Sequence, residues 1–308
     1  MRILITGGYG YLGSRIADFF LKNTNHEIVI ASRRNKPISN DIEFVNINWK
    51  EIESIKKCCL NIDVILHLAG MNAQECQENP GLAHQINTVN SANLFLSAQE
   101  MKVKKFVYFS TIHVYGDPLN GIIDEDSLTK PNHPYSISKY NSEIRLQQLI
   151  KESKIKLIVI RLSNSFGSPI YLNSNCWMLL MNDIAKQIIL NKQIVLNSDG
   201  KQRRDFISIN NVCRAVNHLV NTDLGNSVFN LGGEWTPTIN EIATTMQSLS
   251  KKYVGNHPKI KRIYTNTNSK SVKFSFKIDR IKKTGFHLKN NNLNEIENLI
   301  SKAFLFFN

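Results

Sequence analysis

The fold is decided close to the start of the chain, by the stretch Thr6-Gly7-Gly8-Tyr9-Gly10-Tyr11-Leu12-Gly13. An apolar run at 3–5 precedes it, and an amphipathic segment begins at Leu12. Glycines at this spacing allow a tight turn, a close approach of the backbone to a pyrophosphate, and a helix N-terminus that faces the anion. A position between a strand and a helix is the context that gives this motif its meaning. We therefore predict dinucleotide binding, against the alternative of a simple tight turn, at Gly7, Gly10, Tyr11, Leu12 and Gly13.

Short β-branched runs alternate with amphipathic stretches through the first half of the chain. Strands are predicted at 2–6, 27–31, 44–47, 63–68, 105–110 and 156–160, and the longest helices at 12–21, 80–101 and 134–152. This alternation indicates an α/β fold, a Rossmann-type doubly wound parallel sheet. After Gly167 the pattern weakens. We predict a dinucleotide-binding domain at 1–167, which also receives about residues 204–233, and a smaller C-terminal substrate-binding lobe at 168–308.

Composition excludes several classes of protein. Among the 308 residues no stretch approaches the roughly 20 apolar residues of a membrane span, and we expect no signal peptide and no membrane partner. The five cysteines lack C-x-x-C spacing, so they predict free thiols and no metal site. The net charge of +13 is scattered and lacks a nucleic-acid-binding motif. It would equally steer a diphosphate substrate. We expect a cytoplasmic protein that does not bind nucleic acid.

The second predicted strand ends in Ala31-Ser32-Arg33-Arg34. A carboxylate at this place suits a free ribose 2′-hydroxyl, whereas a basic residue suits a 2′-phosphate. Ser32 offers a hydroxyl, and the forked guanidinium groups of Arg33 and Arg34 match phosphate. NADP(H) is therefore favoured over NAD(H). The alternative is that both arginines are solvated and that the pocket accepts NAD.

A phenol and an ammonium lie one helical turn apart in Tyr135-Ser136-Ile137-Ser138-Lys139. An unperturbed tyrosine has a pKa near 10, so it needs help to ionise at neutral pH. Lys139 and an oxidised nicotinamide ring would both favour the phenolate. Tyr135 could then act as a base toward a sugar or alcohol hydroxyl and as an acid toward a ketone.

Seven segments together resemble the extended short-chain dehydrogenase/reductases, the NAD(P)-dependent sugar-nucleotide epimerase/dehydratase family, over most of the chain. They are the opening glycine turn, His67-Leu68-Ala69-Gly70, Asn87-Thr88-Val89-Asn90, Ser110-Thr111 before Val114-Tyr115-Gly116, Tyr135 with Lys139, Arg161-Leu162-Ser163-Asn164-Ser165-Phe166-Gly167, and Gly200-Lys201-Gln202-Arg203-Arg204-Asp205-Phe206.

The resemblance assigns roles to these positions. It implies that Thr111 hydrogen-bonds the reacting C–O group, that Tyr135 transfers the proton, and that Lys139 also holds the nicotinamide ribose. Further cofactor contacts are implied at Leu68, Ala69, Asn87 and Ser163. Asn164 and Arg204 match positions that bind the substrate diphosphate. Two alternatives remain open: Asn164 could be a structural turn residue, and Arg204 could form a surface ion pair with Asp205. The helices at 80–101 and 134–152 resemble the pair through which family members form homodimers.

The residues after Thr111 bear on the reaction. Family members that eliminate water or decarboxylate carry a Glu there, usually after an Asp, whereas this chain has Ile112 and His113. A 4,6-dehydratase is therefore not expected. His113 could protonate a carbanion, since histidine titrates near neutral pH, or it could be a polar wall of the sugar pocket.

Three interpretations of function remain. The basic residues after the second strand favour reduction of a 4-keto group of a nucleotide sugar, because a reductase consumes NADPH at each turnover. A sugar-nucleotide 4-epimerase with retained cofactor is the alternative. From another class comes a catalytically idle cofactor-binding scaffold protein.

Overall fold

The first strand is apolar on both faces, which places it inside a sheet. In the computed structural model, which describes residues 1–33, 42–263 and 274–308, β1 (Arg2–Thr6) lies between β2 (Glu27–Ser32) and β4 (Val64–His67). Ile3, Leu4 and Ile5 are fully buried. Parallel strands covered on both sides are near-continuous apolar runs, which explains the sequence of β1.

Internal contacts divide the chain into two units. Unit 1 comprises Met1–Pro118, Glu125–Leu162 and Ala215–Asn230. Unit 2 comprises Leu119–Asp124, Ser163–Arg214 and Leu231–Asn308.

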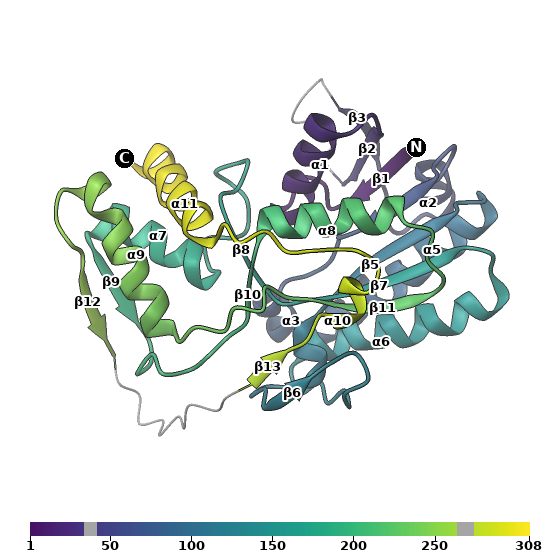
Figure 1. Cartoon of the computed structure of the whole chain (residues 1–308). Coiled ribbons are helices and arrows are strands. Elements are labelled where there is room, and N and C mark those ends of the chain that lie inside the picture. Colours follow the sequence, from purple (N-terminus) through teal and green to yellow (C-terminus); the bar gives the residue numbers. More distant parts are fainter. Residues whose placement is uncertain (34–41, 264–273) are drawn as a thin grey trace. The chain divides into compact units, whose positions relative to one another are not determined.

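A seven-stranded sheet is the centre of unit 1, in the order β11-β7-β5-β4-β1-β2-β3 (Figure 1). The other strands are β3 (Glu43–Asn46), β5 (Lys105–Thr111), β7 (Lys156–Leu162) and β11 (Ser227–Leu231). Neighbouring strands from β3 to β7 pair in parallel. The order reverses between β1 and β4, and ligands of such sheets bind at the carboxyl ends of the strands near this switch point. The predicted doubly wound fold is confirmed.

Helices cover both faces of this sheet (Figure 1). On one face α2 (Ile52–Cys58), α5 (Asn90–Glu100) and α6 (Pro134–Leu149) enclose an apolar core that includes Phe95 and Phe106. On the other face α1 (Tyr11–Asn23) buries Ile16 and Phe20. Shorter elements are α3 (Ala73–Glu78), α4 (Pro80–Ala83), and 3₁₀ turns at Ile112–Tyr115 and Ile150–Glu152; α8 (Ile209–Asn221) contains residues of both units.

The segment at 80–101, predicted as one continuous helix, is not regular α-helix in its middle. A π-helical turn, η1 (His84–Val89), separates α4 from α5. The buried side chains of Asn87 and Thr88 in this turn hydrogen-bond to the side chain and the carbonyl of Ser138 on α6. The spacing of apolar residues in the sequence does not reveal such contacts. π-helical turns within helices are frequent at functional sites.

Unit 2 has its own apolar core between helices and short strands. Its helices are α7 (Leu180–Asn191), α9 (Ile239–Val254), α10 (Asp279–Lys282) and α11 (Asn292–Phe307). Three parallel strand pairs join β8 (Asn164–Phe166) to β10 (Phe206–Ser208), β9 (Gln193–Leu196) to β12 (Lys259–Arg262), and β6 (Gly121–Ile123) to β13 (Phe274–Phe276). No helix in the described part of the chain is long and apolar enough to cross a membrane.

Candidate active site

The glycine turn links β1 to α1 with almost no space for side chains. A Cβ atom at Gly13 would lie 2.3 Å from the Gly7 carbonyl oxygen, and Gly7 has a φ of +72°. The Gly10 N–H donates to the same carbonyl at 2.9 Å, and Gly10 is the N-cap of α1. Tyr11 and Leu12 open the helix, whose first turn contains no acidic residue. The turn therefore leaves the N–H groups and positive dipole end of α1 available to an anion.

A cavity of about 1160 Å³ lies in unit 1, and Ala69 in its lining packs against Gly7 of this turn. It is lined by the strand ends that follow β2, β3 and β4 and by the helical segment after them, including Arg33, Asn46, Asn48, Trp49, His67, Ala69, Gly70 and Asn90. Ser32 is half-buried at the end of β2. Arg34 lies outside the described residues. Of the predicted cofactor contacts, Arg33 and Ala69 line this cavity.

Thr111, Tyr135 and Lys139 lie together in unit 1. Thr111 ends β5, and the other two lie one turn apart on α6. Burial raises the pKa of the Tyr135 phenol to about 12, with a smaller contribution from nearby Cys76, while a hydrogen bond with Thr111 opposes the rise. Burial lowers the pKa of the Lys139 ammonium to about 8. Lys139 Nζ donates to the Phe109 carbonyl at 2.9 Å and lies 5.0 Å from the Tyr108 ring centroid.

Asn87 connects this group to the end of β4. Its Oδ1 accepts from the Met71 N–H at 2.8 Å, and its Nδ2 donates to Ser138 Oγ at 2.9 Å. A Cβ atom at Gly70 would lie 2.8 Å from Asn87 Oδ1 and 3.4 Å from Lys139 Nζ. The structure therefore brings Asn87, Gly70 and Lys139 close together in unit 1.

His113 follows Thr111 in the 3₁₀ turn at Ile112–Tyr115. Its backbone N–H donates to Thr111 Oγ1 at 3.3 Å, and its side chain is half-buried. Ile112 is buried.

A buried ion pair that the sequence did not suggest supports the same elements. Arg161 on β7 and Glu143 on α6 approach to 2.8 Å, and both are buried. The Ser110 hydroxyl hydrogen-bonds to Glu143 Oε1, and Arg161 Nη1 donates to the Tyr115 hydroxyl at 2.9 Å. Glu143 lies one helical turn after Lys139, and this spacing is the feature of the sequence that could have pointed to it. Charges with such satisfied partners hold β5, β7 and α6 in one arrangement.

Three residues predicted to contact the cofactor or the substrate lie in unit 2: Ser163, Asn164 and Arg204. Ser163 and Asp205 are both buried, and the Ser163 side chain opposes the rise that burial causes in the pKa of Asp205. Asn164 Nδ2 donates to the Asp205 carbonyl at 2.9 Å, so this amide also stabilises the β8–β10 pair. The guanidinium of Arg204 donates to Gln202 Oε1 at 3.0 Å. Asp205 is fully buried, which does not suit a surface ion pair with Arg204.

Comparison with known proteins places the chain in a family. The model of the NAD dependent epimerase/dehydratase family matches residues 3–232. The chain belongs to this family. It is an enzyme of the epimerase and dehydratase class, as the resemblance implied.

Relatives of this chain include proteins named as epimerases and proteins named as dehydratases. A putative UDP-glucose 4-epimerase of Methanocaldococcus jannaschii is 27% identical over 78% of this chain and 79% of its own length. A dTDP-D-glucose 4,6-dehydratase of Mus musculus is 25% identical over 82% and 73%. UDP-glucuronic acid 4-epimerase of Bacillus cereus, solved with UDP-glucuronic acid and NAD, has a TM-score of 0.84 at 20% identity and full coverage of both chains.

The cavity in unit 1 is also lined by residues that the sequence did not predict as site residues. Asn46 ends β3, which is adjacent to β2 in the sheet, and Ile47, Asn48 and Trp49 follow it. Their signal was weak, because a polar stretch after a short strand is typical of any loop. The order of strands had to be known before this loop could be placed beside the end of β2.

Proposed function

We propose that this chain transfers a hydride at C4 of a nucleotide-activated sugar, and that its net reaction is 4-epimerisation with a retained dinucleotide. The observation that carries the proposal is the joint placement of Thr111, Tyr135 and Lys139 in unit 1. These are the hydroxyl, acid/base and cationic groups that oxidation of a sugar hydroxyl needs. The named 4-epimerases of the family, with UDP-sugars and NAD, support this choice.

The residues beside Thr111 argue against the dehydratase reaction of other relatives. Elimination of water needs a proton to be removed from one carbon and added to a leaving hydroxyl on the next. Ile112 is buried and has no titratable group, and His113 stands where a carboxylate would be needed. For His113 we propose the role of a polar wall of the sugar pocket, with proton transfer to a carbanion as the alternative.

The residues of unit 1 fit a dinucleotide. The absence of side chains at Gly7, Gly10 and Gly13 would let a pyrophosphate approach the N-terminus of α1, with Tyr11 and Leu12 beside it. We propose further contacts at Leu68, Ala69, Asn87 and Lys139 of unit 1 and at Ser163 of unit 2. When bound, oxidised NAD supplies a hydride acceptor and a positive charge beside the phenol.

The chain's own groups would move the proton. Tyr135 takes the proton of the C4 hydroxyl, Thr111 orients that oxygen, and the Lys139 ammonium favours the phenolate. The phenol with its raised pKa stays protonated in the free protein, so it becomes a base only beside added positive charge. Inversion would follow if the 4-keto sugar presented its other face before C4 was reduced again, and Tyr135 would then return its proton to the C4 oxygen. Asn164 and Arg204 are proposed to bind the substrate diphosphate.

Reduction of a 4-keto nucleotide sugar by NADPH is the second candidate, and one observation favours it. Arg33 lines the cavity at the end of β2, where no carboxylate follows the strand. An assay of NADPH oxidation with 4-keto sugar nucleotides separates the candidates. A reductase consumes NADPH in proportion to product, whereas an epimerase forms the C4 epimer without net consumption. Arg33→Ala should weaken NADPH binding much more than NADH binding if Arg33 contacts a 2′-phosphate.

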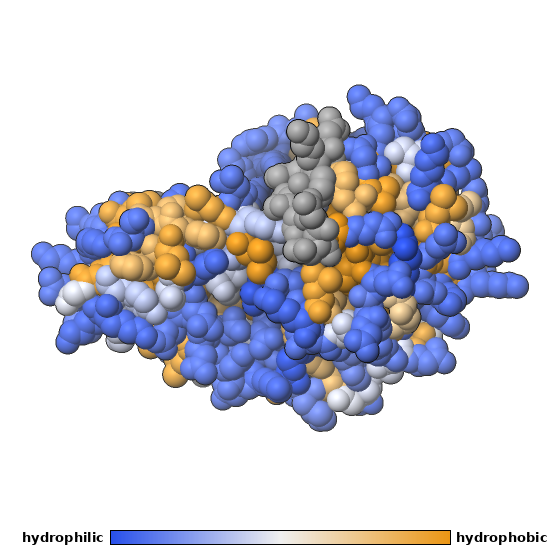
Figure 2. Space-filling model, turned by 90° about the horizontal axis from the view of Figure 1, so that it is seen from above, coloured by the Kyte–Doolittle hydropathy of each residue, from blue (hydrophilic) through white to orange (hydrophobic). Residues whose placement is uncertain are grey.

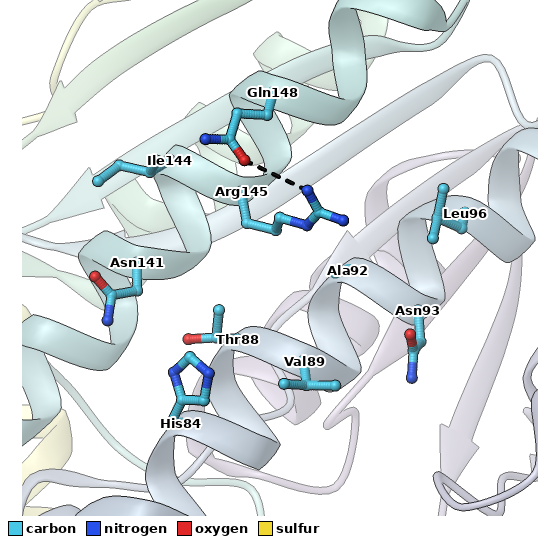
Figure 3. A pocket seen from close by; sticks show the side chains of 10 residues that line it. All are labelled: His84, Thr88, Val89, Ala92, Asn93, Leu96, Asn141, Ile144, Arg145 and Gln148. Atoms are coloured by element: carbon cyan, nitrogen blue, oxygen red, sulfur yellow. Dashed lines mark hydrogen bonds between the residues drawn. The ribbon is translucent and has the colours of Figure 1, made fainter.

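We also propose a homodimer through α5 and α6. A shallow surface pocket of about 450 Å³ lies between them (Figure 3). Its lining includes Val89, Ala92 and Leu96 from one side and Ile144 from the other. Ile137 on α6 is also exposed. Analytical ultracentrifugation tests this, because a species that remains monomeric at micromolar concentration contradicts the dimer.

A further inference from the structure

Net positive charge is concentrated in unit 2. Over the full sequence this unit contains 19 lysines and arginines against 9 aspartates and glutamates, so it carries ten of the thirteen net positive charges. Such asymmetry within one chain points to a negatively charged partner. A substrate diphosphate requires only a few of these charges.

Aromatic side chains gather where α11 ends. Trp177 lies 4.8 Å from Phe307 and 6.2 Å from Phe306 between ring centroids, and Tyr253 lies 5.8 Å from Phe304. We call these five residues the C-terminal aromatic cluster. They come from the loop before α7, from the end of α9 and from the last turn of α11.

Aliphatic side chains beside this cluster are open to solvent. Leu305 is 71% exposed, Met178 50% and Leu179 37%. Figure 2 shows apolar surface gathered at the left of the view, in the part of unit 2 that contains α7 and α11. Exposed apolar groups next to partly covered aromatic rings are typical of a surface that meets another apolar medium.

Lysines surround the C-terminal aromatic cluster and pack against its rings. Lys302 Nζ lies 4.7 Å from the Phe306 centroid, Lys252 Nζ 5.2 Å from Tyr253, and Lys186 Nζ 5.6 Å from Phe307. This combination of aromatic rings, exposed aliphatic side chains and lysines is found on surfaces that lie in the interface of a bilayer. Lys252 is paired with Glu297, so Lys186 and Lys302 are the cations proposed to reach lipid phosphates while the apolar groups enter the headgroup region.

We propose that this face of unit 2 binds the surface of an anionic lipid bilayer. A second copy of the chain is disfavoured as the occupant, because the contact would bring together two units that each carry a large net positive charge. Nucleic acid is disfavoured because phosphate contacts would use the lysines and leave Leu305 and Met178 in water. The sequence-based expectation of no membrane partner was drawn from the lack of a long apolar segment, which bears on spanning and not on surface binding.

The test is co-sedimentation of the full-length chain with vesicles of phosphatidylcholine, with and without phosphatidylglycerol. We expect binding to the anionic vesicles, with loss at high salt. Leu305→Glu should weaken partitioning by about tenfold or more, because burial of a leucine is replaced by burial of a charge. Lys302→Gln should weaken it by about fivefold.

Leu128→Glu is the matched control, since Leu128 is an apolar residue of unit 1 that is 72% exposed. It makes the same change of charge and should leave partitioning unchanged. Saturating UDP should not displace the chain from vesicles. Displacement would show that the positive charge of unit 2 serves to bind the substrate, and it would overturn the proposal. Equal sedimentation of Leu305→Glu, Leu128→Glu and the parent chain would also overturn it. So would a monomer–dimer equilibrium that Leu305→Glu abolishes without any vesicle binding by the parent.

Discussion

The Lys139 ammonium donates a hydrogen bond to the Phe109 carbonyl at 2.9 Å, two residues before Thr111 on the same strand. This contact ties helix α6, which carries Tyr135, to strand β5, which ends in Thr111. The position of the phenol relative to the hydroxyl thus depends on a buried cation. Lys139 therefore has a structural as well as an electrostatic effect on the proposed proton transfer.

Removal of the phenol hydroxyl tests the proton-transfer role. Tyr135→Phe should lower turnover by about 10²-fold or more, because the general acid/base is lost. NAD affinity, measured by calorimetry, should remain within about twofold, since the ring and its packing are kept. Tyr140→Phe removes a phenol hydroxyl from the same helix and serves as the matched control. Near-parental turnover in Tyr135→Phe would remove Tyr135 from the mechanism.

The buried ammonium predicts a pH dependence of stability. Burial lowers the pKa of Lys139 from 10.5 to about 8, so between these values the unfolded chain binds more protons than the folded one. Lys139 therefore destabilises the fold below pH 8, and this effect is relieved as pH rises to 10.5. At about 1.4 kcal/mol per pKa unit, the relief is about 3 kcal/mol.

Urea unfolding of the parent chain and of Lys139→Met across this range measures the effect. The parent should gain stability relative to the variant as pH rises from 8 to 10.5. A constant difference between the two chains would show that the Lys139 pKa is not lowered by folding.

A methyl group at the glycine turn should disrupt it. Gly13→Ala places a Cβ atom 2.3 Å from the Gly7 carbonyl oxygen, so the turn or α1 must shift. We expect NAD affinity to fall at least about tenfold and the unfolding temperature to fall by several degrees. Gly225→Ala is the matched control, because no atom lies within 4 Å of its added Cβ. Similar NAD affinities in the two variants would be incompatible with the proposed pyrophosphate site.

Breaking the buried ion pair should cost much stability. Arg161→Met leaves the Glu143 carboxylate without its guanidinium partner, at a cost of about 3–5 kcal/mol in the free energy of unfolding. The double variant Arg161→Met with Glu143→Met removes the unpaired charge and should recover a large part of this loss. If the two single losses simply added in the double variant, the pair would not be coupled.

The sequence predicted those features that depend on local chemistry. Gly7, Gly10 and Gly13 must occur at a tight strand-to-helix turn, and the alternation of apolar segments predicts the doubly wound sheet that the structure confirms. Tyr135 and Lys139 share a helix, so their spacing alone placed them on one face. Their hydrogen-bond partners Thr111 and Phe109 come from a strand that the family motifs had already singled out.

What the sequence did not predict depends on contacts between distant segments. The π-helical turn at His84–Val89 arises where Asn87 meets Ser138, 51 residues later in the chain. The Arg161–Glu143 pair joins a strand to a helix, and Asn46 to Trp49 reach the cavity only because β3 pairs with β2. No local pattern distinguishes these residues from solvated ones.

The central claim is hydride transfer at C4, and C4 inversion tests it most directly. The purified chain is incubated with UDP- and dTDP-linked hexoses and hexosamines plus catalytic NAD, and products are identified by proton NMR. We predict that at least one sugar nucleotide equilibrates with its C4 epimer, and that Tyr135→Phe does not catalyse this. Absence of inversion across the panel, with stoichiometric NADPH oxidation by 4-keto sugar nucleotides or with no turnover at all, would contradict the account.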